Sequence, residues 1–152
     1  MILMDTLSRA CLTLRYDDDG KIVSVKDNLG NEAVFAYAAG RLVSYTDAAG
    51  NVITYEYDME NRIVVSAVNQ RKTVENRYDE QGRVIWQKSG EAELALAYED
   101  GETYHKVTLT DANGNISSHI TDTHYRITST TDGNGNTTIY AYDPKGNLLR
   151  EE

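Results

Sequence analysis

Two stretches carry oxygen-bearing side chains at the alternating positions that begin a calcium-binding loop. They are Asp111-x-Asn113-x-Asn115 and Asp132-x-Asn134-x-Asn136, with Asp122 and Asp143 at the twelfth positions. A calcium loop of this kind needs glycine at its sixth position and a bidentate glutamate at its twelfth. Ile116 and Thr137 hold the sixth positions here. Because Asp and Asn also stabilise ordinary turns, we expect turn chemistry and no metal.

Catalytic candidates are few. His105, His119 and His124 lie in one stretch, but a metal or proton-transfer site would need them to converge in space, and we expect surface residues instead. The 24 Asp and Glu residues single out no catalytic pair, Cys11 stands alone, and Gly-x-Ser-x-Gly is absent. We therefore expect no enzyme, no catalytic residue, no cofactor-binding residue and no cofactor.

The dominant feature of the chain is a repeated phrase of Tyr-Asp, two residues, Gly and then a basic or polar residue. It marks a set of signature residues that we interpret as structural: Tyr16, Asp17, Gly20, Tyr57, Asp58, Tyr78, Asp79, Gly82, Tyr142, Asp143 and Gly146. Whole or decayed copies start at residues 16, 37, 57, 78, 98, 121 and 142, so the intervals are 21, 20, 21, 20, 23 and 21. A second phrase, Thr-Asp-x-x-Gly-Asn, lies between copies at 46–51, 110–115 and 131–136. Such a period indicates a repeat architecture.

Each half-repeat has the pattern of one strand and one turn. Residues 41–46 and 51–57 are rich in β-branched and aromatic residues, and Gly, Asp and Asn punctuate them. Alternation places Ile53, Tyr55 and Tyr57 on one face. The spacing predicts about thirteen strands, including one over residues 91–97 despite their helix-friendly letters. The expected fold is all-β, a repetitive antiparallel array of strands and hairpins.

Tyrosine is the principal aromatic residue, with 11 Tyr against one Phe and one Trp. Its apolar ring and polar tip suit a thin wall wetted on one side. When repeats stack, tyrosines at equivalent positions would form a cross-strand ladder. Tyr45, Tyr55 and Tyr140 are the candidate ligand-facing tyrosines if the surface binds carbohydrate.

The charge and hydropathy of the chain argue against a nucleic-acid partner and a membrane span. A net charge of −9 repels a phosphate backbone, so we expect no nucleic-acid partner. No run of eighteen apolar residues is present, which predicts no membrane span, and the first fourteen residues do not read as a signal peptide. We expect two segments: residues 1–14 as a non-repeat lead-in, and residues 15–152 as an array with about seven repeat starts, the last one truncated.

The alternating phrases resemble those of the Rhs (YD-repeat) family, over about residues 14–150. Residues 41–58 give a nearly complete copy. The family includes bacterial polymorphic toxins, the C components of insecticidal toxin complexes, and teneurins. The resemblance implies a β-sheet ribbon that spirals into a hollow shell; in toxin members the shell encloses a toxic domain, and a self-cleaving segment closes it. It also implies secretion or cell-surface association as part of a larger bacterial protein.

The chain departs from the full family pattern in two ways. Seven repeats suffice only for an arc of such a shell, so we expect a piece of a larger protein. The family's Asp-Pro-x-Gly-Leu closing phrase is matched only in part by Asp143-Pro144-Lys145-Gly146, because Asn147 replaces Leu.

Two functions remain. We favour a structural wall segment that encapsulates a toxin or other cargo, with the remaining repeats and cargo domain of the parent, or its own copies through open sheet edges, as partners. The alternative is a carbohydrate or cell-surface binding module.

Overall fold

The computed structural model describes residues 2–4 and 11–152, and all regular structure in these ranges is β. The strands are β1 (Ile2–Met4), β2 (Cys11–Tyr16), β3 (Ile22–Asp27), β4 (Glu32–Ala38), β5 (Arg41–Thr46), β6 (Val52–Tyr57), β7 (Ile63–Val68), β8 (Arg71–Tyr78), β9 (Val84–Ser89), β10 (Ala92–Asp100), β11 (Tyr104–Asp111), β12 (Ile116–Asp122), β13 (Ile127–Thr131), β14 (Thr137–Tyr142) and β15 (Leu148–Glu151). The all-β prediction is confirmed, and residues 91–97 fall mainly in β10. The described ranges contain fifteen strands rather than about thirteen, and β1 with most of β2 comes from the first fourteen residues.

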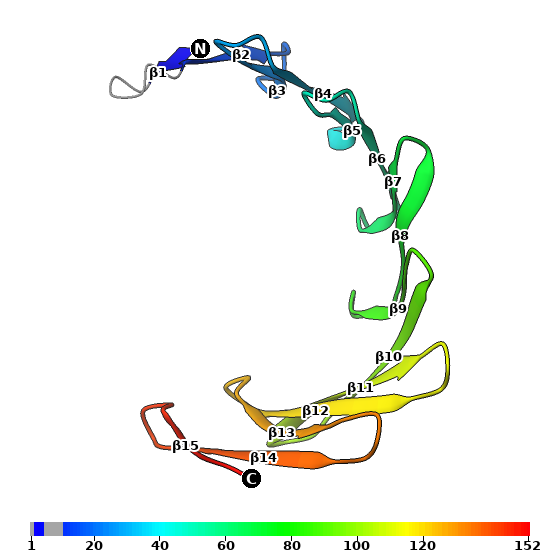
Figure 1. The fold of residues 1–152 in the computed structure, drawn as a ribbon, viewed down its shortest axis with the longest axis vertical. Helices are drawn as coiled ribbons and strands as arrows, with labels where there is room; N and C mark the ends of the chain where they lie inside the picture. The colour runs from blue at the N-terminus through cyan, green and yellow to red at the C-terminus, as the bar shows by residue number, and fades with distance from the viewer. Residues whose placement is uncertain (1, 5–10) are drawn as a thin grey trace. The chain divides into compact units, whose positions relative to one another are not determined.

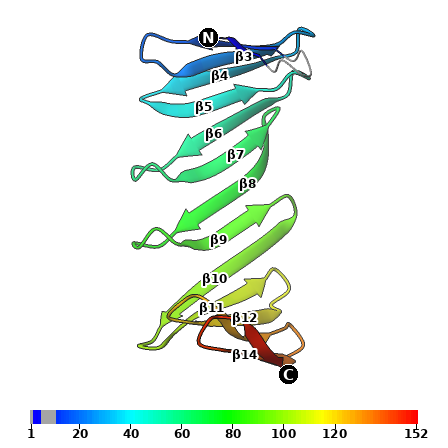
Figure 2. The ribbon, with the colours of Figure 1, turned by 90° about the vertical axis from the view of Figure 1, so that its left-hand side faces the viewer.

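The chain divides into two compact units, residues 1–75 and 76–152. In the first, β1 to β7 lie in chain order and each pairs antiparallel with the next. In the second, β9 to β15 do the same. Hairpin turns join neighbouring strands, as with β4 and β5 (Figure 1). Figure 2 shows β3 to β7 side by side.

Hairpin turns alternate between the two edges of each unit. The Tyr-Asp turns lie at one end of the strands, which we call the Tyr-Asp edge. The Thr-Asp turns lie at the other end, which we call the Thr-Asp edge. A β-bulge lies beside the Tyr-Asp turn in the pairs β2–β3, β4–β5, β6–β7, β12–β13 and β14–β15. The pairs β3–β4, β5–β6, β11–β12 and β13–β14 keep one register throughout. The pair β7–β8 has a bulge near the opposite edge, and β10–β11 has none. Because a bulge bends its strand and increases twist, the repeat deforms the sheet chiefly, though not solely, at the Tyr-Asp edge.

The sheet has almost no interior. Among the described residues, only Ala67 at 7% and Ser24 at 5% exposure are buried. Along β6, burial alternates, with Ile53, Tyr55 and Tyr57 half-buried and the intervening residues exposed. The same alternation recurs in β4 and β14. One face is therefore partly covered by its own rings and aliphatic chains.

The opposite face leaves apolar side chains in solvent. Val34, Ile116 and Ile139 lie there, with Ile116 and Ile139 each 57% exposed. A folded sheet normally covers one apolar face with a second layer. Among the described residues, every strand belongs to the sheet itself, so stability depends on local hydrogen bonds and on contacts between neighbouring repeats.

Candidate functional site

The aspartate of each turn is bonded to the turn that it begins. In the β5–β6 turn, Asp47 Oδ1 accepts hydrogen bonds from the backbone N–H groups of Ala49 (2.9 Å) and Asn51 (2.8 Å). Asp47 Oδ2 accepts another from Asn51 Nδ2 at 2.8 Å. The Gly50 N–H donates to the Asp47 carbonyl at 3.0 Å, and Gly50 has φ +85°, which only glycine adopts without strain. The hydrogen bond from the Asn51 side chain, followed by that from its backbone, lowers the pKa of the Asp47 carboxyl.

The two stretches that resemble calcium loops have this same geometry. Asp111 Oδ1 accepts from the N–H groups of Asn113 (2.8 Å) and Asn115 (2.9 Å), and Asp132 does so from Asn134 and Asn136. Each carboxylate thus faces its own turn rather than a common centre. Within the described ranges, no three His, Cys, Asp or Glu side chains gather as a metal-binding group.

In three Tyr-Asp turns an arginine takes the place of the asparagine. Arg62 Nε lies 2.7 Å from Asp58 Oδ2, and Arg83 and Arg126 make the same bond at 2.7 Å to Asp79 and Asp122. The hydrogen bond from the Arg126 side chain is the main cause that lowers the pKa of Asp122 to about 2. Asn and Arg at the fourth position after Asp therefore both hydrogen-bond the aspartate Oδ2. We did not predict this equivalence, although the fixed spacing of these residues in the sequence indicates it.

The signature residues divide by position. Asp17, Asp58, Asp79 and Asp143 accept a hydrogen bond from the backbone N–H four residues on, and Gly20, Gly82 and Gly146 have positive φ. The four signature tyrosines, Tyr16, Tyr57, Tyr78 and Tyr142, are each the last residue of a strand. Asn147 donates through Nδ2 to Asp143 Oδ2 (2.8 Å), so the partial closing phrase forms an ordinary turn here.

Four tyrosines near strand ends each link a Tyr-Asp turn to the one before it. The Tyr57 hydroxyl donates to the Leu42 carbonyl at 2.6 Å, while the Arg41 guanidinium lies over the Tyr57 ring at 5.4 Å. We call this pair of contacts the edge clasp. It recurs at Tyr37 with Ile22 and Lys21, at Tyr98 with Val84 and Arg83, and at Tyr142 with Ile127 and Arg126. The ring partner is thus the cation of the preceding repeat and not, as we expected, the neighbouring tyrosine.

A different contact joins the repeats that begin at residues 98 and 121. His105 Nδ1 lies 2.8 Å from Asp100 Oδ1, and the His105 ring stacks on Tyr125 with centroids 5.0 Å apart and an interplanar angle of 6°. His119 lies on β12 and His124 in the turn that follows. The three histidines therefore do not form one site in the described chain.

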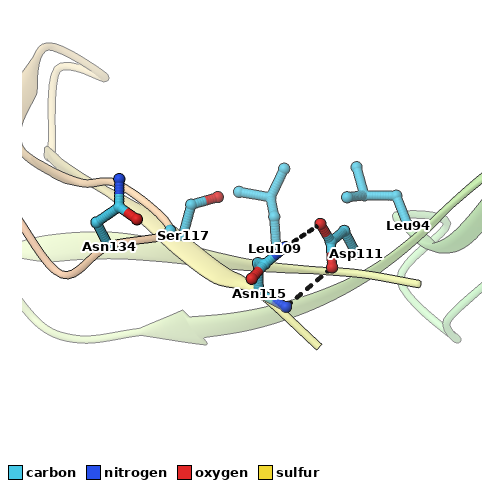
Figure 3. Close-up of a pocket in the computed structure, with 7 residues that line it drawn as sticks. Leu94, Leu109, Asp111, Asn115, Ser117 and Asn134 are labelled. Carbon is cyan, nitrogen blue, oxygen red and sulfur yellow. Dashed lines mark hydrogen bonds between the residues drawn. The ribbon is translucent and has the colours of Figure 1, made fainter. Parts of the chain in front are cut away.

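A shallow hollow of about 370 Å³ opens in the second unit at the Thr-Asp edge (Figure 3). Leu94 and Leu109 supply apolar side chains, and polar groups come from Asp111, Asn115, Ser117 and Asn134. In the first unit the equivalent pair to Leu109 and Ser117 is Tyr45 and Ile53. The hollow exists because smaller side chains stand where the first unit has larger ones.

The candidate ligand-facing tyrosines do not converge on this hollow. Tyr45, Tyr55 and Tyr140 are half-buried in β5, β6 and β14. The Tyr45 ring packs against Phe35, with centroids 5.2 Å apart, which covers part of the surface that a sugar would use.

No helix in the described part of the chain is long and apolar enough to cross a membrane.

Comparison with known proteins gives a consistent result. The family described as RHS Repeat matches residues 16–52, 37–74 and 107–151. No curated protein matches the chain by sequence. Among solved structures, "TcdB2-TccC3-TEV" superposes with a TM-score of 0.67 at 16% identity, covering 92% of this chain and 9% of that one.

Two related structures agree. TcdB2-TccC3 without its hypervariable C-terminal region gives a TM-score of 0.56 at 14% identity over 99% of this chain and 11% of that one. A Tc holotoxin pore of Photorhabdus luminescens gives 0.56 at 14% identity over 93% and 11%. At these identities the likeness concerns the fold, and the chain spans about a tenth of each matched protein.

Proposed function

Because the chain belongs to the RHS repeat family, we propose that it is a wall segment of a larger shell that encloses a toxin or another cargo. The observation that carries this proposal is the single-layered antiparallel sheet in which neighbouring repeats are joined by edge clasps. Such a sheet has the form of a partition, and its described residues contain no cluster of three His, Cys, Asp or Glu side chains that could hold a metal.

Three features support a wall over a self-sufficient domain. One sheet face exposes Val34, Ile116 and Ile139, which a cargo or further chain would cover. Bulges recur beside the Tyr-Asp turns, and repeated bending at one edge suits a curved wall. The matched structures are about ten times longer, which leaves room for the remaining repeats. Secretion or cell-surface association as part of a bacterial toxin belongs to the same proposal.

Edge strands provide the first test. β15 ends the strand order, and the backbone groups along its outer side invite pairing with another strand. We expect the isolated chain to associate in light scattering. Leu149→Lys, which places a charge on this edge at a residue 68% exposed, should reduce association. The matched control is Leu29→Lys, which adds the same charge at an 82% exposed turn residue and should leave association unchanged. A monomer at high concentration, or equal effects of both variants, contradicts edge pairing.

The sequence that flanks this stretch in its gene tests whether the chain helps to enclose a cargo. A wall segment predicts additional repeats in register on one or both sides of this stretch and a separate domain for cargo in the same protein. A parent without further repeats would overturn the proposal. In that parent, release of the cargo domain to added protease should require disruption of the repeat array.

The glycan-binding alternative rests on Tyr45, Tyr55 and Tyr140. Its test is a titration with a panel of oligosaccharides, followed by the NMR signals of these three rings. Absence of shifts at all three removes the alternative, and saturable shifts at any of them would favour it over a purely structural wall.

A further inference from the structure

One link along the Tyr-Asp edge is chemically unlike the four edge clasps described above. Lys21, Arg41, Arg83 and Arg126 provide the cation of the four edge clasps. Lysine and arginine stay charged across the neutral pH range. Between the β10–β11 turn and the β12–β13 turn, the ring contact is made by His105 instead. Imidazole is the side chain that gains or loses its charge between about pH 5 and 8.

His105 is held from two sides. On one side its Nδ1 lies 2.8 Å from Asp100 Oδ1, and Asp100 Oδ2 accepts a hydrogen bond from Arg83 at 2.8 Å. On the other side its ring stacks on Tyr125. A continuous series of contacts thus joins three successive Tyr-Asp turns, from Arg83 through Asp100 and His105 to Tyr125. We call the His105–Tyr125 contact, with its Asp100 anchor, the seam.

Tyr125 makes the seam sensitive to the state of His105. Its φ of +60° is the left-handed conformation that the equivalent Gly82 and Gly146 adopt freely. A bulky side chain at such an angle is strained. Tyr125 is also 75% exposed, so the stacked imidazole is the ring that supports it. Weakening the stack removes a contact from a turn in which a tyrosine, and not a glycine, holds the strained left-handed position.

The charges around His105 come from three elements. On β10, Asp100 faces it directly, and Glu99 is engaged by the hydroxyl of Tyr104. Across β12, Thr121 is its register partner. In the β12–β13 turn, Tyr125 stacks on it, while Asp122 and Arg126 bond to each other. Lys106 follows it on its own strand. The Asp100 carboxylate is therefore the group in direct contact with His105 that stabilises its protonated form.

We propose that His105 makes the seam between the β10–β11 and β12–β13 turns pH-sensitive, tight at mildly acidic pH and looser once the imidazole loses its proton. A protonated imidazole forms a charge-assisted hydrogen bond to Asp100 and presents a cation to the Tyr125 ring. The hydrogen bond from His105, followed by that from Arg83, lowers the pKa of Asp100, which favours the charged carboxylate beside the imidazole. The direction is thus a gain in local stability when the imidazole is protonated.

The seam is a property of this chain alone; only its consequence, a wall weakest here at alkaline pH, rests on the proposed function. Loss of association in the edge-strand test would leave the seam intact. Conversely, a pH-insensitive seam would leave the wall proposal standing, so the two failures are distinguishable.

Hydrogen exchange of the Tyr125 amide tests the seam, because this N–H donates to the Asp122 carbonyl at 2.9 Å and closes the turn. We expect its protection, corrected for intrinsic exchange, to be about two- to fivefold higher at pH 5.5 than at pH 7.5, the range for an exposed ion pair. The Gly20 amide, which donates to the Asp17 carbonyl and closes a turn outside this series of contacts, is the internal control and should show no such change.

Two substitutions at His105 assign the effect. His105→Arg supplies a permanent charge and should abolish the pH dependence, with protection near the acidic value. His105→Gln supplies none and should abolish it with protection near the alkaline value. His119→Gln, on the middle of β12, should leave the wild-type dependence unchanged. Equal protection of Tyr125 at both pH values in the wild-type chain, or a dependence that persists in His105→Arg, overturns the proposal.

Discussion

Removing one hydroxyl tests the edge clasp most directly. In the Tyr57→Phe variant the ring remains under Arg41, at 5.4 Å in the native chain, but the 2.6 Å hydrogen bond to the Leu42 carbonyl is lost. A neutral hydrogen bond contributes about 1 kcal/mol net to stability. Because the first unit has 75 residues, a loss of this size should lower its melting temperature by about 4–8 °C.

Tyr55→Phe is the matched control. Tyr55 lies two residues earlier on β6, on the same face and similarly half-buried, and the described part of the chain shows no hydrogen bond from its hydroxyl. Urea denaturation of both variants, with equal m-values, gives the difference in the free energy of unfolding. We expect Tyr55→Phe to lie within a few tenths of a kcal/mol of wild type. Equal losses in the two variants would refute the clasp as the reason for tyrosine at Tyr57.

Three further predictions follow from the turns and the hollow. Asp122, whose pKa is lowered to about 2, stabilises the fold above the ordinary aspartate range near 3.9; this contribution is lost as the pH falls through about 2, so Asp122→Asn should flatten the acid limb of the stability profile of the chain. Gly50→Ala, at φ +85°, should cost about 1–2 kcal/mol in urea denaturation, whereas Gly133→Ala, whose added Cβ would meet only Asn115 at 3.5 Å, should be tolerated. Ser117→Ile, which fills the hollow with the residue type found at Ile53, should raise stability by about 0.5–2 kcal/mol.

Each of these has a contrary outcome. An unchanged acid limb in Asp122→Asn would mean that its arginine partner contributes nothing to the fold. Equal costs at the two glycines would remove backbone strain as the explanation for the glycine of the Thr-Asp phrase. A less stable Ser117→Ile chain would show that the hollow is closed to larger side chains.

Repetition made much of the fold predictable from the sequence. The period of 20 to 23 residues and the turn residues at fixed offsets identified the strands and their order, because short turns force consecutive strands to pair. The expected face shared by Ile53, Tyr55 and Tyr57 agrees with the burial pattern of β6, since alternation is a local property of an extended chain.

Contacts between repeats were beyond the sequence. Tyr57 on β6 contacts Leu42 and Arg41 on the neighbouring strand β5, and the distances between these groups are known only from the paired strands. The exchange of Asn51 for Arg62 at one turn position is visible in the letters, but their common hydrogen bond to aspartate is not.

Local chemistry and periodicity alone were enough to identify an all-β repeat array whose aspartates and glycines serve its turns. Only the tertiary structure showed which contacts join one repeat to the next, because they depend on which atoms the paired strands bring within hydrogen-bonding distance. It also showed that His105 and Tyr125, from two decayed copies twenty residues apart in number, stack in one contact. In the sequence a decayed copy shows only a lost pattern, whereas in space His105 and Tyr125 make a contact of their own.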